Sequence, residues 1–351
     1  MAISLIVPTL PDAPAGGQAY NRRLIAALAT LGQRVDVREI PGTHPTYTQA
    51  ARDAAEALLA RLPAEDRVVI DGLALPAFAG HLDALAARCV CGLIHHPHAL
   101  EAGLPDRLRA EIRAAELTVL PRLSRIVATS QRVADKLIAD FAVGGERIAV
   151  VAPGRDAVAR SAGSGGPDCA ILSIGALVPR KGHDVLLRAL ARLFDLDWHL
   201  RIVGSAARDA GHARRLENLA ASLGIASRVR FVGAPDDAAL EALWQSADLF
   251  ALASHWEGFG MATAEALARG LPVAVTGSGP DGSAGGDLVA PETGVVVPPG
   301  DHDGMSKAMR RLIFSAELRQ EMGEAAWRQS QDWPDWATQA QAFLIALAAD
   351  I

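Results

Sequence analysis

The sequence predicts an α/β protein built from two doubly wound, Rossmann-like domains that face each other across a cleft. Short apolar runs alternate with helix-length amphipathic segments along the chain, and the alternation breaks once before it restarts. The 351 residues, 50% of them hydrophobic, are too many for one ordinary core. Strand–helix alternation of this kind produces parallel sheets through right-handed crossovers. Ligands of such sheets bind at the carboxyl ends of the strands, which makes the cleft between the two domains the natural site.

The first half of the chain supplies the first of these domains. A buried-type strand is expected at Ile3–Val7. A helix is expected at Gln18–Leu31, because apolar residues recur on one face of it: Tyr20, Leu24, Leu28 and Leu31. Helical sequence separates the further strands, which are expected at Val35–Arg38, Val68–Ile70, Val90–Ile94, Arg125–Ala128 and Ile148–Val151.

The break comes at SAGSGGP, residues 161–167, which has the composition of a linker. Strands are then expected at Ala170–Ile174, His199–Val203, Val229–Val232 and Leu249–Ala251, with helices at Val185–Phe194, Ala210–Leu223 and Asp237–Gln245. The predicted organisation is therefore a domain over residues 1–160, a linker at 161–167 and a domain over 168–332. A final amphipathic helix at Ala337–Ala348, within 333–351, either caps the second domain or crosses back to the first.

Composition and charge exclude several classes of protein. The formal net charge is −6 without a block of like charge, which argues against a nucleic-acid partner. The three cysteines, Cys89, Cys91 and Cys169, form no Cys-x-x-Cys pair, and Cys89 and Cys91 are expected as buried thiols along a strand. The N-terminus has no signal-peptide pattern and no stretch approaches a membrane span, so a cytoplasmic protein is expected. Contact with a membrane surface remains open.

The segment HWEGFGMATAEALARGLPVAV, residues 255–275, carries the strongest chemical signal. Glu257 and Glu265 lie eight positions apart on either side of the run Gly258-Phe259-Gly260, and helical sequence follows at once. This predicts Glu257 in a loop and Glu265 just inside a helix. Glycines let a ligand approach the backbone, a helix start favours an anion, and carboxylates accept hydrogen bonds from sugar or ribose hydroxyls. As isolated residues, both acids are also ordinary complements of a helix dipole.

This segment resembles the family 4 retaining glycosyltransferases, whose mark is a Glu-x7-Glu motif of the form E-G-F-G…E-A-x-A-x-G-x-P-V. GALVPRKGHDVLLRAL (175–190) resembles the family's basic loop in the donor domain, and TGVVVPPGD (293–301) resembles the segment after the nucleotide site. IVATSQRVADKL (126–137) and VVAPGRD (150–156) match the end of the acceptor domain. The resemblance covers almost the whole chain and implies the GT-B fold, with the acceptor domain first and the nucleotide-sugar domain second.

One stretch departs from the family's pattern. GSGPDGSAGGDLV (277–289) is Gly-rich where the family usually carries a Glu before the Val. Donor contacts from this loop are therefore not expected to follow the family.

Arg180 and Lys181 follow the strand Ala170–Ile174 and precede a helix. Two such cations can hold a diphosphate and neutralise its charge as it leaves, although a surface Arg-Lys pair is often only solvated. The resemblance implies that this pair and Gly175 contact the donor pyrophosphate, which removes the need for a metal ion. Asp195-Leu196-Asp197 has the form of a metal-binding DxD motif, but it lies in a helix-to-strand turn and is interpreted as turn chemistry.

Two loops of the first domain also carry candidate residues. Gly16 and Gly17 lie between the first strand and the first helix, where a Gly pair lets backbone N–H groups approach a phosphate or simply forms a turn. IHHPHALEAG (94–103) leaves the strand Val90–Ile94, and its neighbouring histidines diverge rather than form a metal site. The resemblance implies a histidine near the transferred sugar.

His95 aligns best with that histidine and His96 is the alternative. Glu101 either contacts the acceptor or faces solvent.

The function implied is transfer of a sugar from a nucleotide-diphospho-sugar to a hydroxyl-bearing acceptor, with retention of configuration and without a cofactor or metal. His95, Arg180, Lys181 and Glu257 are the expected catalytic residues. Expected donor contacts are Gly16, Gly17, Gly175, Arg180, Lys181, Glu257, Gly258, Phe259, Gly260 and Glu265, and expected acceptor contacts are His96 and Glu101. A nucleotide-sugar epimerase of the same fold, or a catalytically silent nucleotide-sugar-binding protein, is the alternative.

Overall fold

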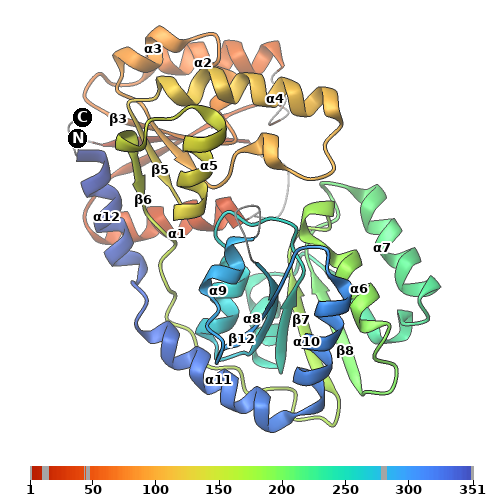
Figure 1. Cartoon of the computed structure of the whole chain (residues 1–351). Helices are drawn as coiled ribbons and strands as arrows, with labels where there is room; N and C mark the ends of the chain where they lie inside the picture. The colour runs from red at the N-terminus through yellow and green to blue at the C-terminus, as the bar shows by residue number, and fades with distance from the viewer. Residues whose placement is uncertain (1, 10–15, 43, 45–47, 278–282, 349–351) are drawn as a thin grey trace. The chain divides into compact units, whose positions relative to one another are not determined.

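The chain folds into two compact units, each an α/β unit with its own parallel sheet (Figure 1). The structure, a computed structural model, describes residues 2–9, 16–42, 44, 48–277 and 283–348. The first unit consists of residues 1–154 with 335–351, and the second of residues 155–334.

The first unit alternates strands and helices through most of its length. Its strands are β1 (Ile3–Pro8), β2 (Val35–Ile40), β3 (Arg67–Asp71), β4 (Cys91–Ile94), β5 (Arg125–Ala128) and β6 (Ile148–Val150). Its helices are α1 (Gly16–Thr30), α2 (Gln49–Arg61), α3 (Leu82–Ala87), α4 (Asp106–Val119), α5 (Gln131–Phe141) and α12 (Trp336–Ala348). Helix α5 is an example of how the sequence determines a helix. The Ser130 side chain caps its start by accepting the Val133 N–H, and its apolar face is buried.

The strands of the first unit pair in the order β2-β1-β3-β4-β5-β6, all parallel. The strand order reverses between β1 and β3, and ligands of doubly wound sheets bind beyond the carboxyl ends of the strands at such a switch point. Asp71 ends β3 at this place, and Asn21 of α1 donates to it.

The second unit repeats the pattern with its own elements. Its strands are β7 (Cys169–Ile174), β8 (Trp198–Val203), β9 (Val229–Gly233), β10 (Leu249–Leu252), β11 (Val273–Thr276) and β12 (Gly294–Val297). Its helices are α6 (His183–Leu190), α7 (Ala210–Ser222), α8 (Asp237–Gln245), α9 (Met261–Ala268), α10 (His302–Phe314) and α11 (Ala316–Gln331). Parallel pairing in the order β12-β11-β10-β7-β8-β9 puts the switch point between β7 and β10.

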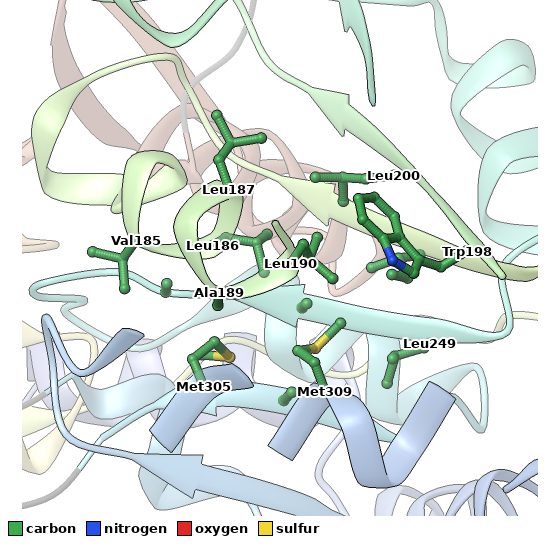
Figure 2. Close-up of a cluster of buried hydrophobic side chains, with 14 of the residues drawn as sticks. Val185, Leu186, Leu187, Ala189, Leu190, Trp198, Leu200, Leu249, Met305 and Met309 are labelled. Atoms are coloured by element: carbon green, nitrogen blue, oxygen red, sulfur yellow. The ribbon is translucent and has the colours of Figure 1, made fainter. Parts of the chain in front are cut away.

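A hydrophobic core fixes helix α6 on the sheet of the second unit. Figure 2 shows leucines of α6 packed with Trp198 of β8 and with Met305 and Met309 of α10. Leu186, Leu187 and Leu190 are all fully buried. Burial of each such side chain stabilises the fold by roughly 1.5–3 kcal/mol. The loop that precedes α6 is therefore attached to a rigid element.

The unit boundaries differ from the expected ones. The Gly/Ser-rich stretch expected as a linker lies within the second unit: Ser161 Oγ donates to Ala247 O at 2.7 Å, and Ser164 N donates to Asp248 Oδ1 at 2.9 Å. Its small polar residues satisfy the backbone and side chains at the end of α8 and the start of β10. The chain passes between the units instead at residues 154–155 and 334–335.

The last helix belongs to the first unit. Helix α12 packs on α1, where the rings of Tyr20 and Trp336 meet edge to face at 5.3 Å between centroids. Of the two alternatives for this helix, the chain therefore returns to the unit in which it began.

Two expectations from the sequence are wrong in detail. Cys89 is exposed, with a φ of 46°, because it lies in the turn before β4 rather than in the strand, whereas Cys91 and Cys169 are buried free thiols. Leu31 is exposed, because α1 ends at Thr30 and only Tyr20, Leu24 and Leu28 of the predicted apolar face are buried. Among the described residues, no helix is long and apolar enough to cross a membrane.

Candidate functional site

The two loops at the switch point of the second unit bring its charged residues together. Arg180 and Lys181 lie in a short 3-10 turn, η5 (Pro179–Lys181), after β7, and Glu257 lies in the loop after β10. The backbone ties the loops to each other, since His255 N donates to Arg180 O at 2.8 Å. The sequence-predicted positions of all three charged residues are confirmed.

Gly182 explains how the two loops come so close. Its φ is 59°, in the left-handed region, and a Cβ there would collide with the carbonyl group of Ala253 after β10. A residue with a side chain would be strained at this φ and would push the loops apart. Only glycine fits the Arg180-Lys181-Gly182 turn against β10.

Glu257 is the centre of a buried ion-pair cluster. Lys181 Nζ lies 2.6 Å and Arg180 Nη1 lies 3.5 Å from Glu257 Oε1, and Ser254 Oγ donates to the same oxygen at 2.7 Å. The side chains of Arg180, Lys181 and Glu257 are 8%, 15% and 11% exposed. Arg180 also donates to Trp256 O at 2.8 Å.

The cluster keeps Glu257 ionised. Burial raises the pKa of the Glu257 carboxyl, but the charges of Lys181 and then Arg180, with the hydrogen bonds from Lys181 and Ser254, outweigh burial and lower it to about 2. Two cations thus share one carboxylate, and the group carries a net positive charge at neutral pH. Such a site suits an anionic ligand such as a phosphate.

Gly175 and His183 support the turn η5, which carries Arg180 and Lys181. A Cβ at Gly175, just beyond β7, would lie 2.9 Å from Lys181 Cδ, so the missing side chain makes room for the stem of Lys181. His183, fully buried at the start of α6, donates its Nε2–H to Gly175 O at 3.2 Å. Burial lowers the pKa of His183 to about 4, so this imidazole is neutral and serves as a hydrogen-bond donor.

The Glu-x7-Glu segment folds as its sequence predicts. Gly258, buried, and Phe259, half-buried, lie in the loop before α9, and Gly260 is the N-cap residue just before the helix, with a φ of 96°. Glu265 lies in the second turn of α9 and is half-buried. Because Glu257 precedes the helix and Glu265 is beyond its first turn, neither is a first-turn acid.

The Gly-rich departure from the family pattern packs against this loop. Ala284 N donates to Glu257 O at 3.1 Å, and a Cβ at Gly260 would collide with Gly285. Gly286 and Gly277 are packed just as closely, since a Cβ built at Gly286 would lie 2.6 Å from Gly277 Cα. Residues 278–282 of this stretch lie outside the described part of the chain. The described glycines therefore allow backbone-to-backbone contact beside Glu257.

The first unit gathers a second polar cluster, around His95. Its Nε2 lies 3.1 Å from Asn21 Oδ1 and 3.4 Å from Asp71 Oδ2, and Asn21 Nδ2 donates to Asp71 Oδ2 at 2.7 Å. Burial disfavours the charged Asp71, but the hydrogen bond and charge of His95, with hydrogen bonds from Asn21 and the Leu73 N–H, outweigh it and lower the pKa of Asp71.

His96 points to a different partner. Its Nε2 lies 3.2 Å from Glu101 Oε2, and both side chains are largely buried, at 15% and 11% exposure. The two neighbouring histidines therefore diverge, as their sequence positions predict. Glu101 is buried rather than in open solvent.

Gly16 and Gly17 are the first residues of helix α1 rather than a loop before it. A Cβ at Gly17 would lie 2.8 Å from His95 Cδ2, so this glycine makes room for the imidazole.

Sequence reasoning missed Asn21, Asp71, Ser254 and His183. A signal exists for Asp71, which is the polar residue that ends the apolar strand VVID, and for Ser254, which lies two residues after the end of β10. The Asp195-Leu196-Asp197 turn has no part in either cluster, because Asp195 is exposed and forms a two-pronged ion pair with Arg310 at 2.7 and 2.8 Å. That turn lies at the start of β8, at the opposite end of the sheet from the site.

Family models match nearly the whole chain. Residues 155–329 match the model of glycosyl transferases group 1, and residues 14–158 match the model of glycosyltransferase family 4. The chain belongs to the family 4 glycosyltransferases.

Curated relatives of this chain include several described as D-inositol 3-phosphate glycosyltransferase. That of Geodermatophilus obscurus is 32% identical over 269 residues, covering 68% of this chain and 59% of the relative. That of Corynebacterium aurimucosum is 31% identical over 274 residues, covering 71% of this chain and 64% of the relative. The chain thus spans less than two thirds of the length of these relatives.

Solved structures share the fold of this chain. Sucrose-phosphate synthase from Thermosynechococcus elongatus matches with a TM-score of 0.81 at 21% identity, over 99% of this chain and 100% of that one. HepE of Anabaena, in complex with UDP and glucose, matches with a TM-score of 0.78 at 18% identity, over 100% of both chains. Together with the two parallel sheets, these matches establish the GT-B fold.

Proposed function

We propose that this protein transfers a sugar from a nucleotide-diphospho-sugar to a hydroxyl acceptor, with retention of the anomeric configuration. The observation that carries the proposal is the cluster of Arg180, Lys181 and Glu257 at the switch point of the second unit. Its net positive charge suits a diphosphate, and Glu257 and Glu265 suit hydroxyl groups. In the first unit, His95 is the residue that we propose for the same reaction.

We propose that the leaving diphosphate is stabilised by these two cations and needs no metal ion. Charge on the diphosphate grows as the bond to the sugar breaks, so Arg180 and Lys181 act most strongly in the transition state. Both contact Glu257, which lowers the cost of ordering two long side chains around a ligand.

The names of the relatives suggest which substrates to test first. The HepE structures hold UDP with glucose, or UDP-glucose, and the curated relatives are named for D-inositol 3-phosphate. We propose UDP-sugars as the first donors and a phosphorylated polyol as the first acceptor. GDP-sugars belong in the same screen.

The test has two stages. A thermal-shift screen of UDP- and GDP-sugars should raise the melting temperature with the matching donor, since stabilisation grows with ligand concentration relative to the dissociation constant. That donor is then incubated with the acceptor and the products are identified. Release of nucleoside diphosphate with a new glycoside is the expected result. Binding without turnover would identify a silent binding protein, and conversion of one nucleotide-sugar into another would identify an epimerase.

A further inference from the structure

The polar cluster of the first unit determines which nitrogen of His95 carries a proton. Asn21 Nδ2 donates to Asp71 Oδ2 at 2.7 Å, which orients the Asn21 amide, because its NH₂ group must face the carboxylate. Asn21 Oδ1 therefore faces His95 Nε2, at 3.1 Å. Asp71 Oδ2 lies 3.4 Å from the same nitrogen. Both neighbours of Nε2 are acceptors, so Nε2 must be the donor.

Asp71 is itself held in place from the other side. It ends strand β3, and its Oδ1 accepts the Leu73 N–H at 2.9 Å. The residue is 5% exposed and Asn21 is also 5% exposed. A buried carboxylate with three hydrogen-bond donors around it keeps one orientation.

The His95 ring is also fixed in orientation. Gly17 approaches one edge of the ring, and Tyr20 meets it edge to face with 5.1 Å between the ring centroids. Tyr20 is fully buried and donates its hydroxyl to Val151 O at 3.0 Å. The imidazole therefore has little freedom to turn and exchange its two nitrogens.

In a neutral imidazole protonated at Nε2, the lone pair is on Nδ1. The His95 side chain is 18% exposed, and no described residue hydrogen-bonds to Nδ1 in the way that Asn21 and Asp71 bond to Nε2. The cluster thus presents a hydrogen-bond acceptor at the carboxyl end of β4, where a doubly wound sheet places its ligand.

We propose that Asp71 and Asn21 are positioning residues that hold His95 in the Nε2–H form, so that Nδ1 accepts a hydrogen bond from a substrate hydroxyl. The second half of this statement rests on the proposed transferase function, whereas the first half concerns the free protein alone.

The decisive variant is Asp71→Asn. The amide introduced at this position keeps an acceptor for the Leu73 N–H and places its NH₂ group where Oδ2 was. The Asn21 amide must then turn over, since two NH₂ groups cannot face each other, and both neighbours of His95 Nε2 become donors. His95 should therefore switch its proton to Nδ1 and lose its acceptor there.

The full-length protein is labelled with ¹⁵N-histidine, and its imidazole nitrogens are observed by NMR at about pH 8.5, well above the ordinary imidazole value. The signal of His95 is identified by its loss in His95→Gln. Wild type should show the proton on Nε2, and Asp71→Asn should show it on Nδ1. Asp66→Asn is the matched control, because Asp66 precedes the same strand and accepts Ser4 Oγ at 2.7 Å; it should leave the His95 signals unchanged.

Transfer activity is the second readout. Asp71→Asn should lower kcat by about 10- to 100-fold, as when a residue that orients a functional imidazole is replaced, with unchanged affinity for the nucleoside diphosphate. Should Asp71→Asn fail to fold, Asn21→Ala keeps Asp71 as an acceptor and should retain the Nε2–H form while lowering kcat. A proton on Nδ1 in the wild type, or an unchanged form in folded Asp71→Asn, overturns the positioning role. If Asp71→Asn carries the His95 proton on Nδ1 and still has full transfer activity, the proposed role of Nδ1 is overturned. A wild type without any transfer counts against the proposed function only, since the NMR result stands independently.

Discussion

Replacing Glu257 by Gln tests the buried ion-pair cluster, because Gln has nearly the same shape as Glu but carries no negative charge. The ordinary pKa of 4.5 falls to about 2 in the folded protein. A lowered carboxyl pKa stabilises the folded state above the unfolded value and loses that effect as the pH falls through the folded value. The difference between 4.5 and about 2 corresponds to about 3 kcal/mol at pH 7.

Glu257→Gln should therefore unfold about 3 kcal/mol more easily than wild type at pH 7, and the difference should shrink to about 1 kcal/mol at pH 3. The magnitude agrees with the roughly 3–5 kcal/mol cost of leaving a buried charge without its partner, here Lys181 and Arg180. Denaturant unfolding is followed by tryptophan fluorescence, which reports mainly on the second unit, since it holds Trp198, Trp244, Trp256, Trp327 and Trp333.

Glu324→Gln is the matched control for this experiment. Glu324 lies in the same unit and its Oε2 is 2.7 Å from Arg160 Nη1, but both side chains are 43% exposed. An exposed pair contributes at most about 1 kcal/mol, so this variant should differ little from wild type at any pH. Equal losses of stability in the two variants, or a Glu257→Gln difference that does not change between pH 7 and pH 3, would refute the reasoning.

Three further predictions concern the proposed transfer reaction. Glu265→Ala should weaken binding of the free nucleoside diphosphate by roughly 1–3 kcal/mol in calorimetry, as for loss of a charged hydrogen-bond partner, and an unchanged affinity would show that Glu265 does not contact the nucleotide. Lys181→Ala should slow transfer by about 2–4 kcal/mol of activation free energy and leave nucleoside binding nearly intact, whereas normal turnover would remove Lys181 from the mechanism. His95→Ala should reduce transfer by about 10²–10⁴-fold at nearly constant nucleotide affinity, if proton transfer is its role. His96→Ala, whose ring pairs with Glu101, is the comparison; the larger loss in His96→Ala would move the role to that residue.

The sequence pattern was sufficient for the architecture and for the second-unit cluster, for a physical reason. The spacing of apolar residues and the composition of each segment indicate which segments are strands and which are helices. Parallel strands then necessarily gather their carboxyl ends at one edge of the sheet. Arg180, Lys181 and Glu257 lie in the loops that leave the carboxyl ends of two strands, so their gathering at one edge of the sheet could be predicted without coordinates. The loop position of Glu257 and the helical position of Glu265 followed from the glycines between them.

The partners of His95 could not be predicted in the same way. Asp71 and Asn21 lie on β3 and α1, and only the packing of α1 beside the switch point brings the three side chains together. The prediction of a linker at residues 161–167 was wrong for a related reason. Glycine and serine indicate a chain without regular structure, but they do not reveal that Ser161 and Ser164 bond to groups of α8 and β10.

The measurement that tests the central claim most directly is transfer from the matching nucleotide-sugar in excess EDTA, with the product examined by NMR. We predict stoichiometric release of nucleoside diphosphate and a glycoside with the anomeric configuration of the donor. Loss of turnover in EDTA that Mn²⁺ or Mg²⁺ restores, or a product of inverted configuration, would contradict the account.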